Sequence, residues 1–146
     1  MVLNKDFREF LQLLNEHEVR YLIVGGYAVA FHGYPRYTKD LDVWIWVNPM
    51  NASHIVEALE AFGFSGLSIS DFTTPEDLIQ LGYPPHRIDI ITSCDGLDFD
   101  ACYGERVLAK IDGLEIPFID LTNLIVNKKA TGRPQDLGDV DNLQKK

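Results

Sequence analysis

Three aspartates in this chain have a spacing that suits metal-assisted chemistry. Asp40 and Asp42 are two residues apart in a β-rich run, so both side chains leave one face of a strand, about 7 Å apart at Cα. Asp89 lies in a second apolar run. Neighbouring carboxylates repel each other, and magnesium, which prefers hard oxygen ligands, removes that repulsion. The aspartates therefore indicate a site for a divalent cation.

Each carboxylate also has a simpler interpretation. An Asp-x-Asp pair is often a solvated strand start, but the residues after Asp42, Val43–Val47, are apolar or aromatic and indicate a strand that enters the core. A buried Asp89 costs free energy unless it is paired or bound to a metal. A salt bridge with Arg87 or with a helix lysine is therefore the alternative for Asp89, and both interpretations stay open.

A glycine pair, Gly25-Gly26, ends the short β-rich run 20–24 just before a helical pattern. Backbone amides at the positive end of a helix bind phosphate without a side chain, and the missing Cβ atoms allow a close approach. The alternative is a tight turn between strand and helix. A dinucleotide fingerprint is excluded because its third spaced glycine is absent.

The elements that must position these residues follow from periodicity and from helix caps. Asn4 caps a first helix with apolar residues at helical spacing, and Asp112-Gly113 predicts a hairpin turn. The order of elements indicates an α/β (α+β) fold with a mixed sheet. The predicted helices are 27–32, 51–62, 75–81, 121–130 and 134–143, and the predicted strands are 20–24, 40–47, 87–92, 105–111 and 114–119.

Composition and charge narrow the function classes. The 146 residues are 46% hydrophobic and 24% charged, which predicts one globular domain over residues 1–146. The net charge of −9 argues against binding to long nucleic acid. The apolar run 22–31 is too short to span a membrane and the N-terminus lacks a signal peptide, so we expect a cytoplasmic protein. The spacing of Cys94 and Cys102 suits neither a zinc nor a redox motif.

Taken together, these motifs resemble the nucleotidyltransferase superfamily that includes DNA polymerase beta. Between the pair Gly25-Gly26 and Asp40-x-Asp42 lie 13 residues, and Asp89 supplies the later aspartate. Two more segments, 36–42 (Arg-x-Thr-x-Asp-Leu-Asp) and 124–137 (Lys, then Gly-Arg-Pro-x-Asp-Leu), resemble the small bacterial members that include AbiEii-type toxins of toxin–antitoxin systems. The resemblance runs from about Val19 to Leu143.

The resemblance implies a polymerase-beta-like fold, with helices packed mainly on one face of the sheet, and a two-metal reaction. Asp40 and Asp42 would hold two Mg²⁺ or Mn²⁺ ions that bridge the triphosphate of a nucleotide such as ATP. Asp89 would complete the second metal site and help to deprotonate the attacking hydroxyl. Gly25 and Gly26 would bind the β- and γ-phosphates.

Basic and polar residues in the same motifs would complete the phosphate site. Arg36 and Lys128 would supply positive charge, and Thr38 would order the loop through a hydrogen bond. For Lys128, a structural ion pair with an aspartate is the alternative. Arg133 has a possible partner in the nearby carboxylate of Asp136.

Three functional hypotheses follow. In the first, the enzyme transfers a nucleoside monophosphate from a nucleoside triphosphate to a hydroxyl of a protein or an RNA such as tRNA, as part of a toxin–antitoxin pair. The second replaces that acceptor with a small molecule of the aminoglycoside kind. The third is a catalytically weak nucleotide-binding or partner-binding module. Many relatives have serine at the position of Gly26, so this chain lacks the hydroxyl that contacts phosphate in them. The resemblance also implies that a partner chain or a homodimer would complete the substrate site.

Overall fold

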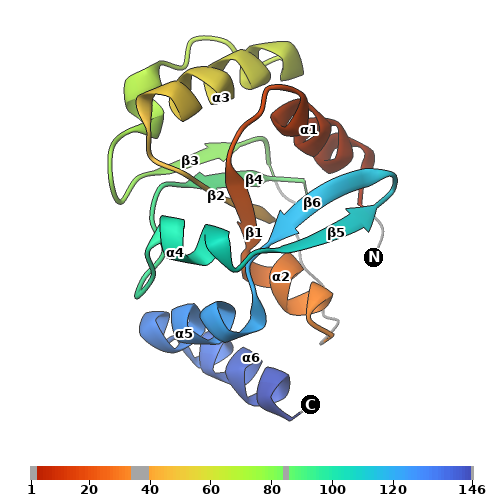
Figure 1. Ribbon diagram of the computed structural model, residues 1–146, viewed down its shortest axis with the longest axis vertical. Helices are drawn as coiled ribbons and strands as arrows, with labels where there is room; N and C mark the ends of the chain where they lie inside the picture. The colour runs from red at the N-terminus through yellow and green to blue at the C-terminus, as the bar shows by residue number, and fades with distance from the viewer. Residues whose placement is uncertain (1–2, 34–39, 84–85, 146) are drawn as a thin grey trace.

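A mixed sheet of six strands organises the chain (Figure 1). The computed structural model describes residues 3–33, 40–83 and 86–145. The strand order is β3-β4-β2-β1-β6-β5, and the pairs β2·β4 and β1·β6 are parallel while the other three are antiparallel. This confirms the predicted α/β class. The strands are β1 (Tyr21–Val24), β2 (Leu41–Ile45), β3 (Leu78–Leu81), β4 (Ile88–Ile91), β5 (Val107–Ile111) and β6 (Leu114–Phe118).

The helices cover the sheet unequally. The two longest, α1 and α3, pack against each other over one face (Figure 1), as the resemblance implies. The shorter α4 packs on the opposite face, where the ring of Trp44 meets Phe99 edge-on at 5.2 Å between centroids. No helix within the described residues is long and apolar enough to cross a membrane. The helices are α1 (Lys5–Glu16), α2 (Gly25–Phe31), α3 (Pro49–Phe62), α4 (Phe99–Gly104), α5 (Leu121–Thr131), α6 (Pro134–Gln144) and the 3₁₀ turn η1 (Ile69–Phe72).

Local signals explain several of these boundaries. The side chain of Asn4 accepts a hydrogen bond from the backbone N–H of Phe7 (2.9 Å) and starts α1 as predicted. Asp112 and Gly113 have φ of +51° and +82°, as a tight turn between two antiparallel strands requires. Gly63, with φ of +110°, ends α3.

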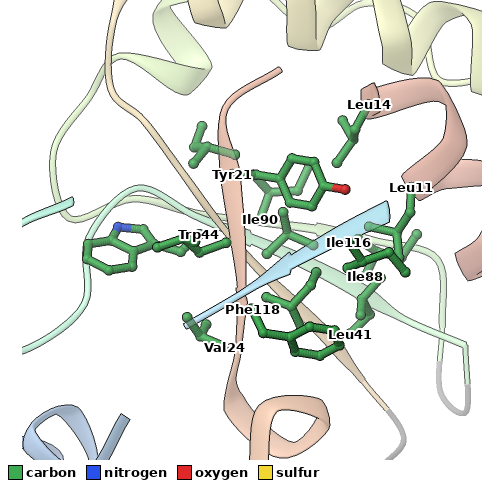
Figure 2. Packing of buried hydrophobic residues seen from close by; sticks show 14 of the residues in the cluster. Leu11, Leu14, Tyr21, Val24, Leu41, Trp44, Ile88, Ile90, Ile116 and Phe118 are labelled. Atoms are coloured by element: carbon green, nitrogen blue, oxygen red, sulfur yellow. The ribbon is translucent and has the colours of Figure 1, made fainter. Parts of the chain in front are cut away.

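The core lies between the sheet and the helices. Figure 2 shows Leu11 and Leu14 of α1 beside Tyr21 of β1, with Trp44 extending away from this group. All four side chains are buried. The hydroxyl of Tyr21 donates to the side chain of Asn15 (2.8 Å), which satisfies the one polar atom of that ring. The amphipathic first helix predicted from the sequence therefore holds the central strands from one side.

One predicted helix is wrong. Residues 75–81, expected to be helical after Pro75, instead lead into the edge strand β3, in which Leu78 pairs antiparallel with Ile91. The backbone N–H of Asp77 donates to the hydroxyl of Thr92 (2.7 Å), which fixes the start of this pairing. Antiparallel pairing with the next strand, β4, therefore outweighs the local helix signal. The helix α4 and the turn η1 have no counterpart in the sequence prediction.

Candidate active site

Strand pairing brings the predicted site residues to one end of the sheet. Asp42 of β2 is the register partner of Asp89 in parallel β4 and of Val24 in antiparallel β1. Paired residues point to the same face of a sheet. Strand β1 ends at Val24, and α2 begins at Gly25. The glycine turn and two of the three aspartates are therefore neighbours, although they lie far apart in sequence.

Gly25 has a conformation and a neighbour that both require glycine. Its φ is +66°, and a Cβ built on it would collide with the carboxylate of Asp42. The missing side chain is thus what allows the Asp42 carboxylate to lie against the backbone between β1 and α2. Gly26, the second predicted glycine, is buried in the first turn of α2.

Asp42 has an unusual protonation equilibrium. Burial, and then the negative charges of Asp89 and Asp40, raise its pKa to about 7. The positive charges of Lys128 and Arg87 lower the pKa of Asp42, but by less than the other causes raise it. Asp42 therefore keeps its proton to a higher pH than an exposed aspartate does.

Arg87 links the other two aspartates. Its Nη2 donates to Oδ2 of Asp40 (2.7 Å) and to Oδ2 of Asp89 (3.1 Å), and its Nε donates to Oδ1 of Asp89 (2.9 Å). Hydrogen bonding to Asp89 raises the pKa of Arg87. Arg87 and Asp89 are two residues apart, a spacing that places both side chains on one face of the extended chain. The salt bridge that the sequence left open for Asp89 is therefore present.

A cleft of about 230 Å³ opens beside Asp42. Gly25 and Asp42 line it together with Lys128 and Arg133. Three aspartates, Asp42, Asp95 and Asp136, and these two cations therefore line one space, a combination that suits a ligand carrying both a metal and a phosphate. The other lining residues are Val24, Ile91, Ser93, Cys94, Asn127 and Thr131.

Lys128 belongs to a buried network between α5 and α6. Its Nζ lies 3.1 Å from Oδ1 of Asp136 and 3.2 Å from Oδ2 of Asp139. Asp136 also accepts hydrogen bonds from the hydroxyl of Thr131 (2.7 Å) and from Nε of Arg133 (2.6 Å). Burial acts to raise the pKa of Asp136, but the hydrogen bonds from Arg133, Thr131 and Lys128 hold it at about 2. Lys128 is thus an ion-pair partner that also lines the cleft.

The structure separates the predicted residues into two groups. Asp42, Gly25 and Lys128 line the cleft, whereas Asp40 and Asp89 gather around Arg87. The predicted phosphate-binding residues at positions 36 and 38 lie outside the described residues.

Sequence reasoning assigned Arg87 and Asp136 no role of their own. For Arg87, the available signal was its spacing of two from Asp89. For Asp136, it was its place within the Gly-Arg-Pro-x-Asp motif. Both thiols are free and buried, and Cys94, which likewise had no predicted role, lines the cleft.

The donor chemistry of this site fits a divalent cation. The carboxylates of Asp40, Asp42 and Asp89 supply the hard oxygens that Mg²⁺ and Mn²⁺ prefer, and Asp42 is held in a cradle that only glycine leaves open. Within the described residues, however, no three such side chains converge as they stand into a set that could hold a metal. Two of the three aspartates, Asp40 and Asp89, are instead paired with the guanidinium of Arg87.

The fold is that of nucleotidyltransferases along nearly its whole length. The lincosamide antibiotic adenylyltransferase LnuA, solved with lincomycin bound, matches with a TM-score of 0.63 at 18% identity, over 98% of this chain and 97% of that one. A putative nucleotidyltransferase from Thermotoga maritima matches with a TM-score of 0.62 at 16% identity. The match covers 99% of this chain and 94% of that one. An antigenic nucleotidyltransferase-like protein from Paracoccidioides brasiliensis matches with a TM-score of 0.56 at 18% identity. The match covers 94% of this chain and 74% of that one.

The chain belongs to the family described as "Nucleotidyltransferase of unknown function (DUF6036)", whose model matches residues 3–144. Among curated proteins, no sequence matches it. The resemblance to the nucleotidyltransferase superfamily and the expected fold are both confirmed. The narrower assignment to the AbiEii-type group stays a prediction.

Proposed function

We propose that this nucleotidyltransferase transfers a nucleoside monophosphate from a nucleoside triphosphate to a hydroxyl group, with release of pyrophosphate and in dependence on Mg²⁺ or Mn²⁺. The observation that carries this proposal is the position of Asp42. Its carboxylate lies against the Gly25 turn and faces a cleft that Lys128 and Arg133 also line. A ligand that carries both a metal and a polyphosphate is the one that such a cleft complements.

The carboxylates have distinct roles in this proposal. Asp40, Asp42 and Asp89 would hold the metal, which, once bound, supplies charge neutralisation to the triphosphate. Asp42 exchanges its proton for the cation, because burial and neighbouring charges already disfavour its bare anion. Asp89 lies on the strand next to that of Asp42, and in this proposal it would complete the metal site and help to deprotonate the attacking hydroxyl.

The backbone and the basic residues would bind the phosphates. Gly25 and Gly26 present amides at the start of α2. Arg133 is largely exposed beside the cleft, although it donates to Asp136. Arg36 and Thr38 complete the phosphate-binding set in this proposal, on the strength of the motif that contains them.

The acceptor has two candidates. A protein or RNA hydroxyl, including tRNA, is the first, and a toxin–antitoxin pair is its biological setting. A small molecule is the second, and the match to LnuA favours it, since 97% of that antibiotic adenylyltransferase is covered by this short chain. In LnuA the shared fold therefore binds a small molecule, lincomycin.

Thermal melting with each nucleoside triphosphate, with and without Mg²⁺ or Mn²⁺, tests the donor site. A ligand at a hundred times its Kd adds about 2.7 kcal/mol to the free energy of unfolding. We expect a metal-dependent rise in Tm for the wild type and for Asp141→Asn, a change at an exposed aspartate, and no rise for Asp42→Asn. Equal shifts in all three proteins would remove Asp42 from the site.

Absence of a shift with every nucleotide would overturn the proposal and favour the partner-binding alternative. Where a nucleotide does bind, a labelled form of it identifies the acceptor class. Transfer of label to tRNA, to a co-purified protein or to an aminoglycoside or lincosamide would separate the candidates.

A further inference from the structure

A second cavity adjoins the cleft beside Asp42. We call it the tryptophan pocket, because Trp44 and Trp46 of the β2 segment line it. Its volume is about 310 Å³, a size typical of sites for small molecules. Ser93 lines both the tryptophan pocket and the cleft. The two spaces therefore share a wall.

The register along β2 sets how far the tryptophan pocket lies from the proposed reaction. Asp42 and Trp44 are two residues apart in this strand, so their side chains leave the same face with Cα atoms about 7 Å apart. A small molecule held in the pocket therefore extends a hydroxyl group to the cleft over a distance shorter than its own length.

The two spaces differ in charge. Lys128 and Arg133 are among the residues that line the cleft. Within the described part of the chain, the charged residues that line the tryptophan pocket are Asp98 and Asp100, and both are exposed. A polyphosphate is therefore attracted to the cleft and repelled from the pocket, which instead attracts a cation.

The tryptophan pocket also has a hydrogen-bond donor that lacks an acceptor. Trp44 is almost fully buried, and its Nε1 has no hydrogen-bond partner among the described residues, although a buried indole N–H usually has one. The ring of Phe99 meets Trp44 edge-on and also lines the pocket. A ligand with an apolar body and an oxygen atom would complement this lining.

We propose that the tryptophan pocket is the acceptor site, and that the acceptor is a small compound with hydroxyl groups, an ammonium group and an apolar face. This inference rests on the proposed function and selects its small-molecule candidate. In the transfer, a hydroxyl oxygen of the acceptor bonds to the α-phosphorus, and the α–β bridging oxygen leaves with pyrophosphate. The hydroxyl proton passes to Asp89, the base in the proposed function.

Tryptophan fluorescence measures occupancy of the pocket, because the chain has two tryptophans and both line it. The probe is phenylserinol, which carries a phenyl ring, an ammonium group and hydroxyls, and its neutral counterpart is phenylglycerol. We expect saturable quenching by both and an affinity about fivefold higher for phenylserinol, since two carboxylates attract it. No quenching by phenylserinol, or equal affinities, would overturn the inference.

A double substitution tests the two carboxylates. Asp98 accepts a hydrogen bond from the backbone N–H of Ala101 (3.1 Å) at the start of α4, and asparagine caps helices equally well. We therefore expect Asp98→Asn/Asp100→Asn to stay folded and to bind both probes equally. Glu105→Gln, at an exposed position outside the pocket lining, should keep the preference for phenylserinol. A preference that survives in the double variant would overturn the inference.

Trp44→Phe tests the unpaired indole N–H. The variant keeps an aromatic ring and leaves Trp46 as the fluorescent reporter. Both probes should lose about fivefold in affinity and by the same factor, since the N–H contacts an oxygen that both carry. Unchanged affinities in the folded variant would overturn the inference. If this core substitution prevents folding, the double variant on α4 still decides.

Two further outcomes separate this inference from the proposed function. Tighter quenching by adenosine than by phenylserinol would assign the pocket to the base of the donor nucleotide and overturn the inference. Transfer of label to tRNA or to a protein, with none to phenylserinol, would overturn it as well while supporting the transferase reaction. Because the fluorescence titration contains no triphosphate, its failure is distinct from failure of the nucleotide-binding test.

Discussion

The carboxylate of Asp42 lies in the space that a Cβ on Gly25 would occupy. The contact joins the middle of the sheet to the turn between β1 and α2. Gly25 therefore requires glycine for two reasons: a Cβ would collide with Asp42, and its φ is +66°. Binding of a phosphate at the Gly25 turn and binding of a metal at Asp42 would both require the absence of a side chain at position 25.

Gly25→Ala should therefore destabilise the protein more than an ordinary change at a glycine of positive φ. Gly66→Ala is the control, since Gly66 has φ of +88° and a Cβ added to it would meet no atom within 4 Å. Backbone strain should cost about 1 kcal/mol in each variant. The collision with Asp42 should cost Gly25→Ala about 2 kcal/mol more. Urea unfolding measures both, and equal losses would mean that Asp42 moves aside freely.

The pH dependence of stability should report on Asp42 in metal-free protein. Its pKa of about 7 in the folded chain lies above the ordinary value of 3.8. The folded state therefore keeps a proton that the unfolded state loses, and stability falls as pH rises from about 4 to about 7, by up to about 4 kcal/mol. Asp42→Asn should remove this fall and be the more stable protein at pH 8. Asp141→Asn should keep the wild-type profile.

Metal binding should release a proton below pH 7. At pH 6 Asp42 is mostly protonated, and a cation that binds its carboxylate displaces the proton. Calorimetry of Mn²⁺ binding in two buffers of different ionisation enthalpy measures the release. We expect close to one proton at pH 6 and almost none at pH 8. Proton release that is unchanged in Asp42→Asn would assign it to another group.

Lys128→Met should be severely destabilising whatever its effect on nucleotide binding. The change leaves Asp136 and Asp139 without a cation that is itself almost fully buried. Removal of one partner from a buried ion pair costs about 3 kcal/mol or more. Lys129→Met, at the exposed neighbouring position, should change the free energy of unfolding by less than about 0.5 kcal/mol. Similar urea midpoints for the two variants would contradict a structural role for Lys128.

Local signals in the sequence predicted much of this fold, and pairing between distant segments decided the rest. The cap at Asn4 and the turn at Asp112-Gly113 are determined by neighbouring residues, and both were predicted correctly. The strand β3 was missed because Pro75 locally favours a helix, whereas the strand forms through its pairing with β4, the next strand along the chain. Strand order is non-local, so the sequence could not show that β4 lies next to β2.

The same distinction applies to the site. Alternation along a strand predicted that Asp40 and Asp42 share a face, and Asp89 was singled out as a carboxylate within a second apolar run. Periodicity alone could not decide between a metal and a salt bridge for Asp89. That choice depends on the distances from Arg87, which links Asp89 to Asp40.

The parallel pairing of β2 with β4 means that the chain makes a long excursion, through α3, η1 and β3, before it returns beside the strand it left. Helix α3 lies at the opposite end of the molecule from α5 and α6, whose residues line the cleft (Figure 1). The turn at Gly66 that follows α3 is exposed. An additional segment inserted at that turn would therefore be expected to leave the cleft between the sheet and the C-terminal helices unchanged.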